Sequence, residues 1–245
     1  KSVEEALASP QADFWREAMD AEIASLYQND TWELVERPRG VRPISVKWVY
    51  ALKTDGLGNI VRFKARLVAK GFMQVEGVDF SDTYAPVSKY STTRAILAVA
   101  ASEGWEVQQL DVKTALLQGE LQERVFVEQP SGYKDGTARV CLLFKALYGL
   151  KQAPRAWYEH LHEHLGQLGY TVSMADPGLY VCTKVGPDGQ RVLLLVYVDD
   201  MLLVSPSSAA VAEAKAKLLS VFDARDLGDV RDFVGMHIER DVEQR

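Results

Sequence analysis

Two apolar runs near residue 200 are separated only by a pair of adjacent carboxylates. Residues 192–204 contain both runs, and Asp199 and Asp200 lie between them. Runs of four to eight aliphatic residues rich in Val predict strands buried on both faces, and the short polar break predicts a tight hairpin. Adjacent carboxylates beside an apolar sheet repel each other and need a cation nearby. The pattern fits a divalent-metal site and also fits an ordinary exposed turn, in which Asp is common.

Apolar residues recur at helical spacing in two earlier parts of the chain. A helix is expected over residues 9–29, with Ser9 as its cap and Pro10 at its first helical position. A second helix is expected to begin at Ser91 as its cap and to end at Gly104. Two more helices are predicted further on, one that runs on from residues 147–158 to Gly169 and one from Ser207 to Phe222.

Period-two alternation predicts a long hairpin formed by residues 46–53 and 60–69 around a turn at 55–59. Shorter strands are expected at 32–35, 105–112, 124–128, 139–144, 178–184 and 233–239, with a turn at 186–189. Asp111 lies at the end of one of these strands, where a lone acid is more often structural than functional. Because hairpins outnumber crossovers, we expect an α+β fold with an antiparallel sheet and helices on one of its faces.

The composition is typical of a globular protein. The chain has 245 residues, of which 47% are hydrophobic and 25% charged, a length that allows one large domain or two small ones. No apolar run approaches the ~20 residues of a membrane span, and the N-terminal residues do not resemble a secretory signal. Cys141 and Cys182 lie in apolar segments and are expected to be reduced, buried thiols of an intracellular protein. The first residue is Lys rather than Met, so we expect a piece of a longer polypeptide.

Charge is distributed unevenly along the chain. The net charge is -6, yet residues 37–72 contain nine basic residues and one acidic residue, and the rest of the chain contains 19 basic and 33 acidic residues. Arg62, Lys64 and Arg66 alternate along one predicted strand and therefore project from the same face. A row of cations on a stiff hairpin suits phosphate binding. The alternative is a solvated charged face without a ligand.

Two further groups could carry chemistry. His160 and His164 are four residues apart on a predicted helix, but the zinc signature with Glu directly after the first His is absent, which favours a solvated face. Gly149 permits a close backbone approach in the loop before that helix. Lys151 and Arg155 add donors near the helix start, where anions bind well.

Eight motifs in a fixed order cover nearly the whole chain. They are Trp32-Glu-Leu-Val, Lys47-Trp-Val-Tyr, Lys64-Ala-Arg-Leu-Val-Ala-Lys-Gly-Phe, Tyr84-Ala-Pro-Val, Gln109-Leu-Asp-Val-Lys-Thr-Ala, Lys145-Ala-Leu-Tyr-Gly-Leu-Lys-Gln-Ala-Pro-Arg-Ala-Trp-Tyr, Tyr197-Val-Asp-Asp and Asp226-Leu-Gly. In this order the sequence resembles the reverse transcriptase of copia-type LTR retrotransposons, the RNA-dependent DNA polymerase region of a Pol polyprotein. Tyr-Val-Asp-Asp alone would be a weak signal, whereas the ordered series is specific.

The resemblance implies a right-hand polymerase made of fingers and palm, with the thumb absent or truncated. Residues 1–90 would hold the N-terminal helix and the basic fingers hairpin. Residues 91–245 would form the palm, with an interleaved fingers segment over about 113–160 and a primer-grip strand at the C-terminal end.

The resemblance also implies a role for individual residues. The catalytic acids are Asp111, Asp199 and Asp200, and the metal-holding set is Asp111, Val112, Asp199 and Asp200. The nucleotide-binding residues are Lys64, Arg66, Leu116, Tyr148, Gly149 and Lys151. The primer grip is expected at Phe233, Gly235 and Met236, and Arg225 is the candidate proton donor for the leaving pyrophosphate.

Two of these positions depart from the family pattern. Leu116 replaces the usual Phe whose ring excludes the ribose 2′-hydroxyl, so the resemblance predicts weaker exclusion of ribonucleotides. Arg225 replaces the usual Lys and is a poorer proton donor, because the pKa of its guanidinium stays above ~12.

The expected function is template-directed addition of dNTPs to a primer 3′-hydroxyl by two-metal phosphoryl transfer in retrotransposon replication. The expected cofactor is a pair of Mg²⁺ ions, with Mn²⁺ as a substitute. Expected partners are an RNA or DNA template with its primer, dNTPs, and the RNase H and integrase regions of the same polyprotein, with no membrane, in a cytoplasmic virus-like particle. Two alternatives stay open, a catalytically silent or domesticated nucleic-acid-binding copy and a nucleotide cyclase that shares the palm topology. The cyclase is disfavoured because it would leave the basic hairpin idle.

Overall fold

The computed structural model describes residues 2–183 and 189–241, so most of the turn predicted at 186–189 lies outside the described residues. The chain divides into two compact units. The first unit comprises Lys1–Tyr84 and Leu116–Trp157, and the second comprises Ala85–Ala115 and Tyr158–Arg245.

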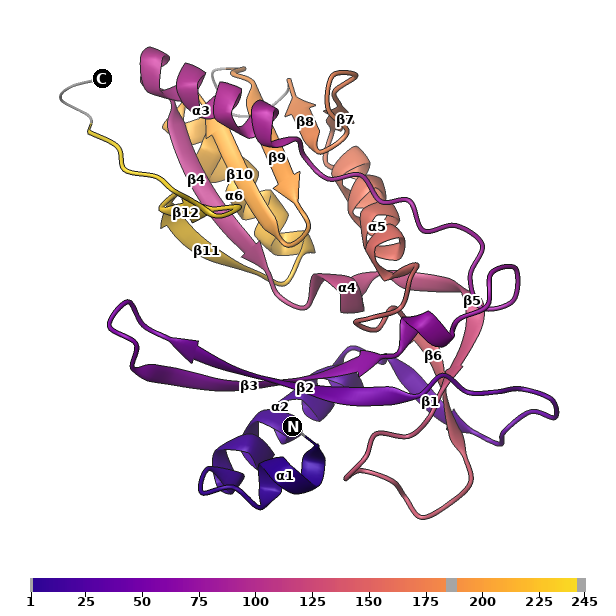
Figure 1. Ribbon diagram of the computed structural model, residues 1–245. Helices are drawn as coiled ribbons and strands as arrows, with labels where there is room; N and C mark the ends of the chain where they lie inside the picture. The colour runs from indigo at the N-terminus through magenta and orange to yellow at the C-terminus, as the bar shows by residue number, and fades with distance from the viewer. Residues whose placement is uncertain (1, 184–188, 242–245) are drawn as a thin grey trace. The chain divides into compact units, whose positions relative to one another are not determined.

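The first unit combines helices with two antiparallel sheets (Figure 1). Strands β2 (Val46–Thr54) and β3 (Ile60–Ala69) pair as the predicted hairpin, and a three-stranded sheet has the order β1-β6-β5. The remaining elements are α1 (Val3–Leu7), α2 (Ala12–Gln28), β1 (Trp32–Val35), the 3-10 turn η1 (Gly71–Met73), α4 (Ala115–Gln118), β5 (Glu120–Val127) and β6 (Val140–Lys145). The first residue of helix α4, Ala115, belongs to the second unit, and the rest of the helix belongs to the first unit.

Helix α2 packs against the hairpin through the apolar stripe that its sequence predicts. Met19, Ile23 and Leu26 are buried at helical spacing. Near the start of the helix the ring of Trp15 meets Phe63 of β3 edge-on, with 4.7 Å between ring centroids. Aromatic contacts of this kind add to the stabilisation from area burial, so α2 holds one face of the hairpin against the core of the first unit.

The predicted start of this helix is wrong. Helix α2 begins at Ala12, and its N-cap residue, Gln11, makes no side-chain cap. The Ser9 hydroxyl instead donates to the carbonyl of Ala6 at 2.7 Å. Ser9 therefore lies just after α1, whose C-cap residue is Ala8. Periodicity could not predict this five-residue helix, because it is shorter than two turns.

The second unit is built on a six-stranded antiparallel sheet with the order β11-β4-β10-β9-β8-β7. Its strands are β4 (Glu106–Val112), β7 (Tyr170–Val172), β8 (Leu179–Cys182), β9 (Val192–Tyr197), β10 (Asp200–Ser205) and β11 (Ala224–Asp229). Its helices are α3 (Tyr90–Glu103), most of α5 (Ala153–Gln167) and α6 (Ser208–Val221). Mixed helices and antiparallel sheets agree with the predicted α+β class.

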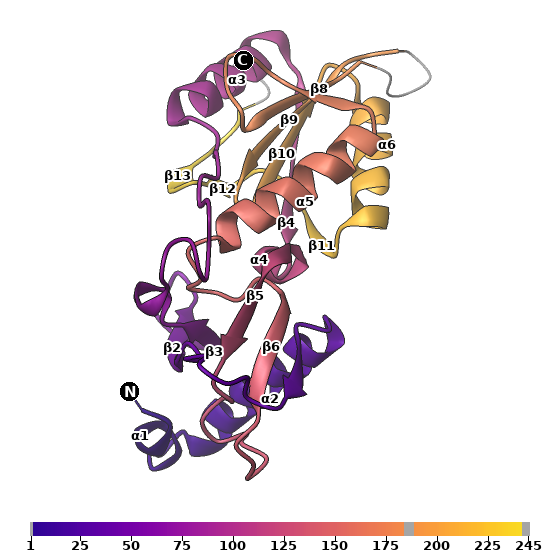
Figure 2. The same ribbon diagram turned by 90° about the vertical axis from the view of Figure 1, so that its right-hand side faces the viewer.

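Helices cover both faces of this sheet, which corrects the expectation of helices on one face. Ile96 of α3 belongs to the same buried cluster as Val107 of β4 and Leu202 of β10. The next residue of β4, Gln108, projects to the opposite face, where its amide oxygen accepts from Lys215 of α6 at 2.9 Å. Figures 1 and 2 show α3 and α6 on opposite sides of the sheet.

Two other details differ from the sequence predictions. Helix α3 begins at Tyr90 with Lys89 as its N-cap, so Ser91 is not the cap, although Gly104 ends the helix in the left-handed region with φ +70°. The strand predicted over 233–239 is a small hairpin of two two-residue strands, β12 (Asp232–Phe233) and β13 (Met236–His237).

Both cysteines are free and buried, as predicted. Burial raises the pKa of the Cys141 thiol to about 12. None of the helices in the described part of the chain is long and apolar enough to cross a membrane.

Candidate active site

The candidate site is a row of side chains across the α3 face of the sheet in the second unit. Asp200, the first residue of β10, is the cross-strand partner of Asp111 in β4. Asp111 also lies opposite Arg225 of β11, and Asp200 also lies opposite Tyr197 of β9. Cross-strand partners project to the same face with Cβ atoms about 5 Å apart. The four side chains therefore stand side by side, and the acid at the end of β4 meets the acidic hairpin.

The turn of the acidic hairpin is tight and strained. Only Val198 and Asp199 separate β9 from β10, and the φ of Val198 is +57°. Two-residue hairpin turns require a positive φ, which Gly adopts freely and a β-branched residue adopts at a cost of about 1–3 kcal/mol. The backbone N–H of Val112 donates to the carbonyl of Asp199 at 2.8 Å, which ties the turn to β4. This bond helps to hold Asp199 beside the Asp111–Asp200 pair.

A buried amide connects the acid pair to the β12–β13 hairpin. The side-chain N–H₂ of Gln109, which is 4% exposed, donates to Oδ1 of Asp200 and to the backbone carbonyl of Asp232, both at 3.1 Å. The spacing of two residues between Gln109 and Asp111 places both side chains on one face of strand β4, and this spacing is visible in the sequence. Gln109 was not predicted as a site residue, because its side chain does not titrate.

The site is short of positive charge. Burial raises the pKa of Asp200, and the negative charges of Asp199 and Asp111 raise it further, although the hydrogen bond from Gln109 lowers it. One cation lies beside the acids, because Nε of Arg225 is 3.8 Å from Oδ2 of Asp111. Both partners are substantially exposed, so this ion pair compensates only part of the charge.

The residues fit a hard divalent cation by their chemistry. Mg²⁺ and Mn²⁺ prefer carboxylate oxygens, and three carboxylates lie within one turn and its neighbouring strand. Val112 has an aliphatic side chain and could contribute only its backbone carbonyl oxygen. Within residues 2–183 and 189–241, no three Asp, Glu, His or Cys side chains converge on one point. The three carboxylates would therefore have to move closer together to share one ion.

In the first unit, the loop 147–152 is fastened to strand β3. The N–H of Ala69 donates to the carbonyl of Tyr148 at 2.7 Å. Gly149 has φ +87°, and a Cβ built on it would lie 2.2 Å from the carbonyl oxygen of Ala69. The guanidinium of Arg66 lies over the ring of Tyr148, 5.1 Å from its centroid. The structure thus brings Arg66, Tyr148 and Gly149 together.

A second buried amide pair fixes the position of Lys151 in that loop. Gln74 and Gln152 are 5% and 3% exposed, and the amide of Gln74 donates to Gln152 at 2.8 Å. Gln74 also accepts from the backbone N–H of Lys151 at 2.7 Å. The Lys151 ammonium lies 4.5 Å from the centroid of the Phe80 ring. Neither glutamine was predicted as a site residue, because an uncharged amide gives no signal of its own in a sequence.

Several other candidate residues have different surroundings from those expected. Phe233 is 1% exposed and belongs to the core beside α3, so its ring anchors the β12–β13 hairpin. Met236 packs partly against the same core, and Gly235 lies in the turn with φ +75°. Leu116 lies in the first unit and packs partly against its core.

Two groups outside the site are also corrected. Arg155 forms an ion pair with Asp82 and is therefore already neutralised. The solvated face predicted for His160 and His164 is only partly right, because both rings are half-buried and lie 6.3 and 5.8 Å from the ring of Phe222.

Comparisons with known proteins identify the family of the chain. Residues 29–244 match the family model described as reverse transcriptase (RNA-dependent DNA polymerase). The chain is 43% identical, over its full length, to the retrovirus-related Pol polyprotein from transposon TNT 1-94 of Nicotiana tabacum. It is 38% identical over 96% of its length to that from transposon RE2 of Arabidopsis thaliana, and 39% identical over 92% to that from transposon RE1.

These relatives are much longer than this chain. The matched region covers 18% of the TNT 1-94 polyprotein, 16% of the RE2 polyprotein and 15% of the RE1 polyprotein. The family match, by contrast, spans most of the chain. The chain belongs to the reverse transcriptase (RNA-dependent DNA polymerase) family, in its copia-type retrotransposon branch.

Proposed function

We propose that the chain is the polymerase core of a retrotransposon, which adds dNTPs to a primer 3′-hydroxyl under the direction of a template. The observation that carries the proposal is the cross-strand pair of Asp111 and Asp200 with Asp199 held beside it in a strained turn. In this proposal the first unit corresponds to the fingers and the second unit to the palm, with the primer grip at the β12–β13 hairpin.

The proposed chemistry needs positioning and charge neutralisation rather than a covalent nucleophile. A pair of Mg²⁺ ions, replaceable by Mn²⁺, would lower the pKa of the primer hydroxyl and stabilise the leaving pyrophosphate. Asp111 and Asp199 would hold the metal, and Asp200 would add negative charge beside them. In the first unit, Lys64 and Arg66 would bind the triphosphate, and the Gly149–Lys151 loop would lie close to the nucleotide.

The proposed setting follows from the relatives. The Pol polyproteins that it matches imply a template with its primer and further polyprotein regions, for which we propose RNase H and integrase. A cytoplasmic virus-like particle is the proposed compartment.

A catalytically silent nucleic-acid-binding protein is the second candidate. Two observations favour it: the three acids do not converge on one point in the described residues, and Arg225 already lies against Asp111. The discriminating property is catalysis, because both candidates bind nucleic acid.

Primer extension on poly(rA) with an oligo(dT) primer separates the two candidates. With Mg²⁺ or Mn²⁺, we expect the wild-type chain to extend the primer and Asp199→Asn to lower the rate at least about a hundredfold, because a carboxylate oxygen that binds the metal is lost. Asp13→Asn, which removes an exposed carboxylate from α2 in the first unit, is the matched control and should extend normally. A wild-type chain that binds the primer–template without extending it would establish the silent candidate.

The same assay tests the proposal for Leu116. A flexible Leu in place of an aromatic ring should exclude the ribose 2′-hydroxyl less well, so rNTPs should be incorporated measurably. We expect Leu116→Phe to raise the preference for dNTPs over rNTPs by about tenfold or more, which corresponds to about 1.4 kcal/mol in the transition state. Equal selectivity in the wild type and the variant would contradict this role.

A further inference from the structure

One face of the β2–β3 hairpin carries only cations and small or aliphatic residues. The register pairs Lys53 with Arg62, Ala51 with Lys64, Val49 with Arg66 and Lys47 with Val68, and partners project to the same side. We call these eight residues the cationic face. It contains five basic residues and no acidic one.

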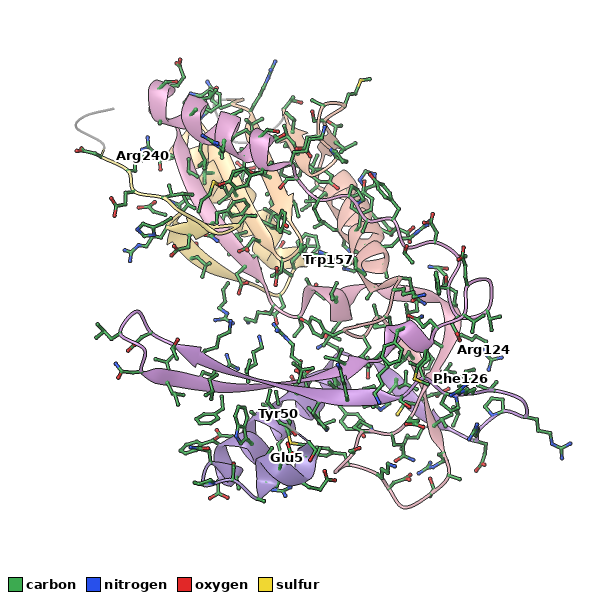
Figure 3. All side chains as sticks on the ribbon, in the orientation of Figure 1. Glu5, Tyr50, Arg124, Phe126, Trp157 and Arg240 are labelled. Carbon is green, nitrogen blue, oxygen red and sulfur yellow. The ribbon has the colours of Figure 1, made fainter. Side chains whose placement is uncertain are left out.

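The opposite face of the hairpin is covered by helices. Trp48, Ala65 and Leu67 are buried there, and the hydroxyl of Tyr50 contacts Sδ of Met19 at 3.3 Å. Figure 3 shows Tyr50 between the hairpin and the helices of the first unit. The cationic face therefore points away from the hydrophobic core of this unit, and Lys47, Val49, Ala51, Lys53 and Arg62 are exposed on it.

Lys53 and Arg62 repel each other with no acid to compensate them. They are direct cross-strand partners, and like charges in this position destabilise a sheet. Neither residue has an ion pair within the described parts of the chain. Burial lowers the pKa of the neighbouring Lys64, and the charges of Arg66, Arg62 and Lys53 lower it further, although Glu22 of α2 raises it. An anion bound between Lys53 and Arg62 would remove the repulsion between their charges.

The triphosphate accounts for only part of this face. Lys64 and Arg66 are the proposed triphosphate contacts, while Lys53 and Arg62 lie one step further toward the loop at 55–59. Arg62 lies two residues from Lys64 on β3, so the two side chains are about 7 Å apart. A phosphate bound by Lys53 and Arg62 would therefore lie one step along the hairpin from the triphosphate contacts. The loop end of the hairpin extends past α1 and α2 in Figure 1, and Lys53 and Arg62 at this end are exposed.

We propose that Lys53 and Arg62 form a binding site for backbone phosphates of a single-stranded nucleic acid, separate from the triphosphate contacts. The ligand class is a phosphodiester strand, read by charge and spacing without base contacts. The statement that this site is separate from the triphosphate contacts rests on the proposed function. Binding of a nucleic-acid strand at Lys53 and Arg62 does not itself require catalysis.

The test is the salt dependence of strand binding. A labelled oligo(rA) is titrated with the wild-type chain and with the Lys53→Gln/Arg62→Gln double variant from 50 to 200 mM salt, and binding is followed by fluorescence anisotropy. Each phosphate contact on a single strand contributes about 0.7 to the slope of log K against log salt. We expect the double variant to bind roughly tenfold more weakly, with a slope smaller by about 1.4, and to melt at the same or a slightly higher temperature than the wild type.

The control removes the same charge elsewhere in the basic segment. Arg37→Gln/Arg39→Gln changes two exposed arginines in the loop before β2 and should leave the slope within about 0.3 of the wild type. An equal loss in both double variants would show that only net charge matters and would overturn the site.

A second arm separates the two phosphate sources. The affinity for dTTP, measured by equilibrium dialysis, should be unchanged in Lys53→Gln/Arg62→Gln and should fall in Lys64→Gln. If the first variant loses dTTP and keeps the strand, the pair belongs to the triphosphate site and the proposal is wrong. Because neither arm requires extension, a catalytically silent chain leaves the result interpretable.

Discussion

At the scale of single residues, Arg225 lies beside Asp111, one of the acids that would attract a metal ion. Its register partner is Asp111, and its Nε lies 3.8 Å from that carboxylate. A guanidinium here neutralises part of the acid cluster and opposes the approach of a second cation. The contact between Arg225 and Asp111 would therefore compete with the proposed metal.

Replacing Arg225 should strengthen metal binding. We expect Arg225→Gln to lower the dissociation constant for Mn²⁺ by up to about fivefold, because exposed ion pairs contribute at most about 1 kcal/mol. Electron paramagnetic resonance of free Mn²⁺ during titration of the chain measures this directly. Arg231→Gln, an equal change of charge at an exposed residue of the same unit, should have little effect. Weaker Mn²⁺ binding by Arg225→Gln would mean that the guanidinium supports the site.

At the scale of elements, the loop 147–152 and strand β3 act as one piece. Gly149 lies in the left-handed region and so close to Ala69 that no Cβ fits between them. The buried amides of Gln74 and Gln152 hold the same loop from its other end. Such satisfied buried networks specify one arrangement, which fixes Lys151 relative to the cationic face.

Gly149→Ala should therefore destabilise the protein strongly. We expect a loss of about 3 kcal/mol or more in the free energy of unfolding, because the new Cβ would require the Ala69 carbonyl to move and Ala is strained at positive φ. Urea denaturation measures the difference. Gly166→Ala is the matched control, because Gly166 lies within α5 with open space around it, and it should be neutral or stabilising by up to about 1 kcal/mol. Similar midpoints for the two variants would contradict the close packing.

The elements that were predicted correctly have a strong pattern, and those that were missed have none. The acidic hairpin and the β2–β3 hairpin follow apolar runs or strict alternation. Strand β11, by contrast, has the sequence Ala-Arg-Asp-Leu-Gly-Asp and no buried residue, so its pairing with β4 leaves no trace in hydropathy. The three-residue strand β7 is too short to show a period.

The candidate site could be predicted only in pieces from residues alone. The adjacency of Asp199 and Asp200 and the phase of Lys64 and Arg66 follow from local spacing. The partnership of Asp111 with Asp200 depends on sheet register, which spacing across most of a domain does not determine. The ordered motifs supplied that pairing by resemblance, and the register in the structure agrees with it.

At the scale of the whole molecule, the basic segment and the acid cluster lie in different units. The net charge is -6, but the first unit contains the basic segment 37–72, and the second unit contains the three acids of the candidate site. Strand binding by the first unit needs no metal, because its cations contact phosphates directly. In the proposed function, catalysis by the second unit would need a metal to neutralise the acids.

Metal removal should therefore separate binding from catalysis. We expect EDTA to abolish primer extension while the affinity for oligo(rA), compared at equal ionic strength, changes by less than about twofold. Asp199→Asn should reproduce this behaviour with Mg²⁺ present, and Lys53→Gln/Arg62→Gln should show weaker strand binding with and without EDTA. Anisotropy and extension measured on the same samples provide both readouts. A parallel loss of strand binding in EDTA would mean that the metal, rather than the cationic face, organises the nucleic acid, and the assignment of the two charges to separate tasks would be wrong.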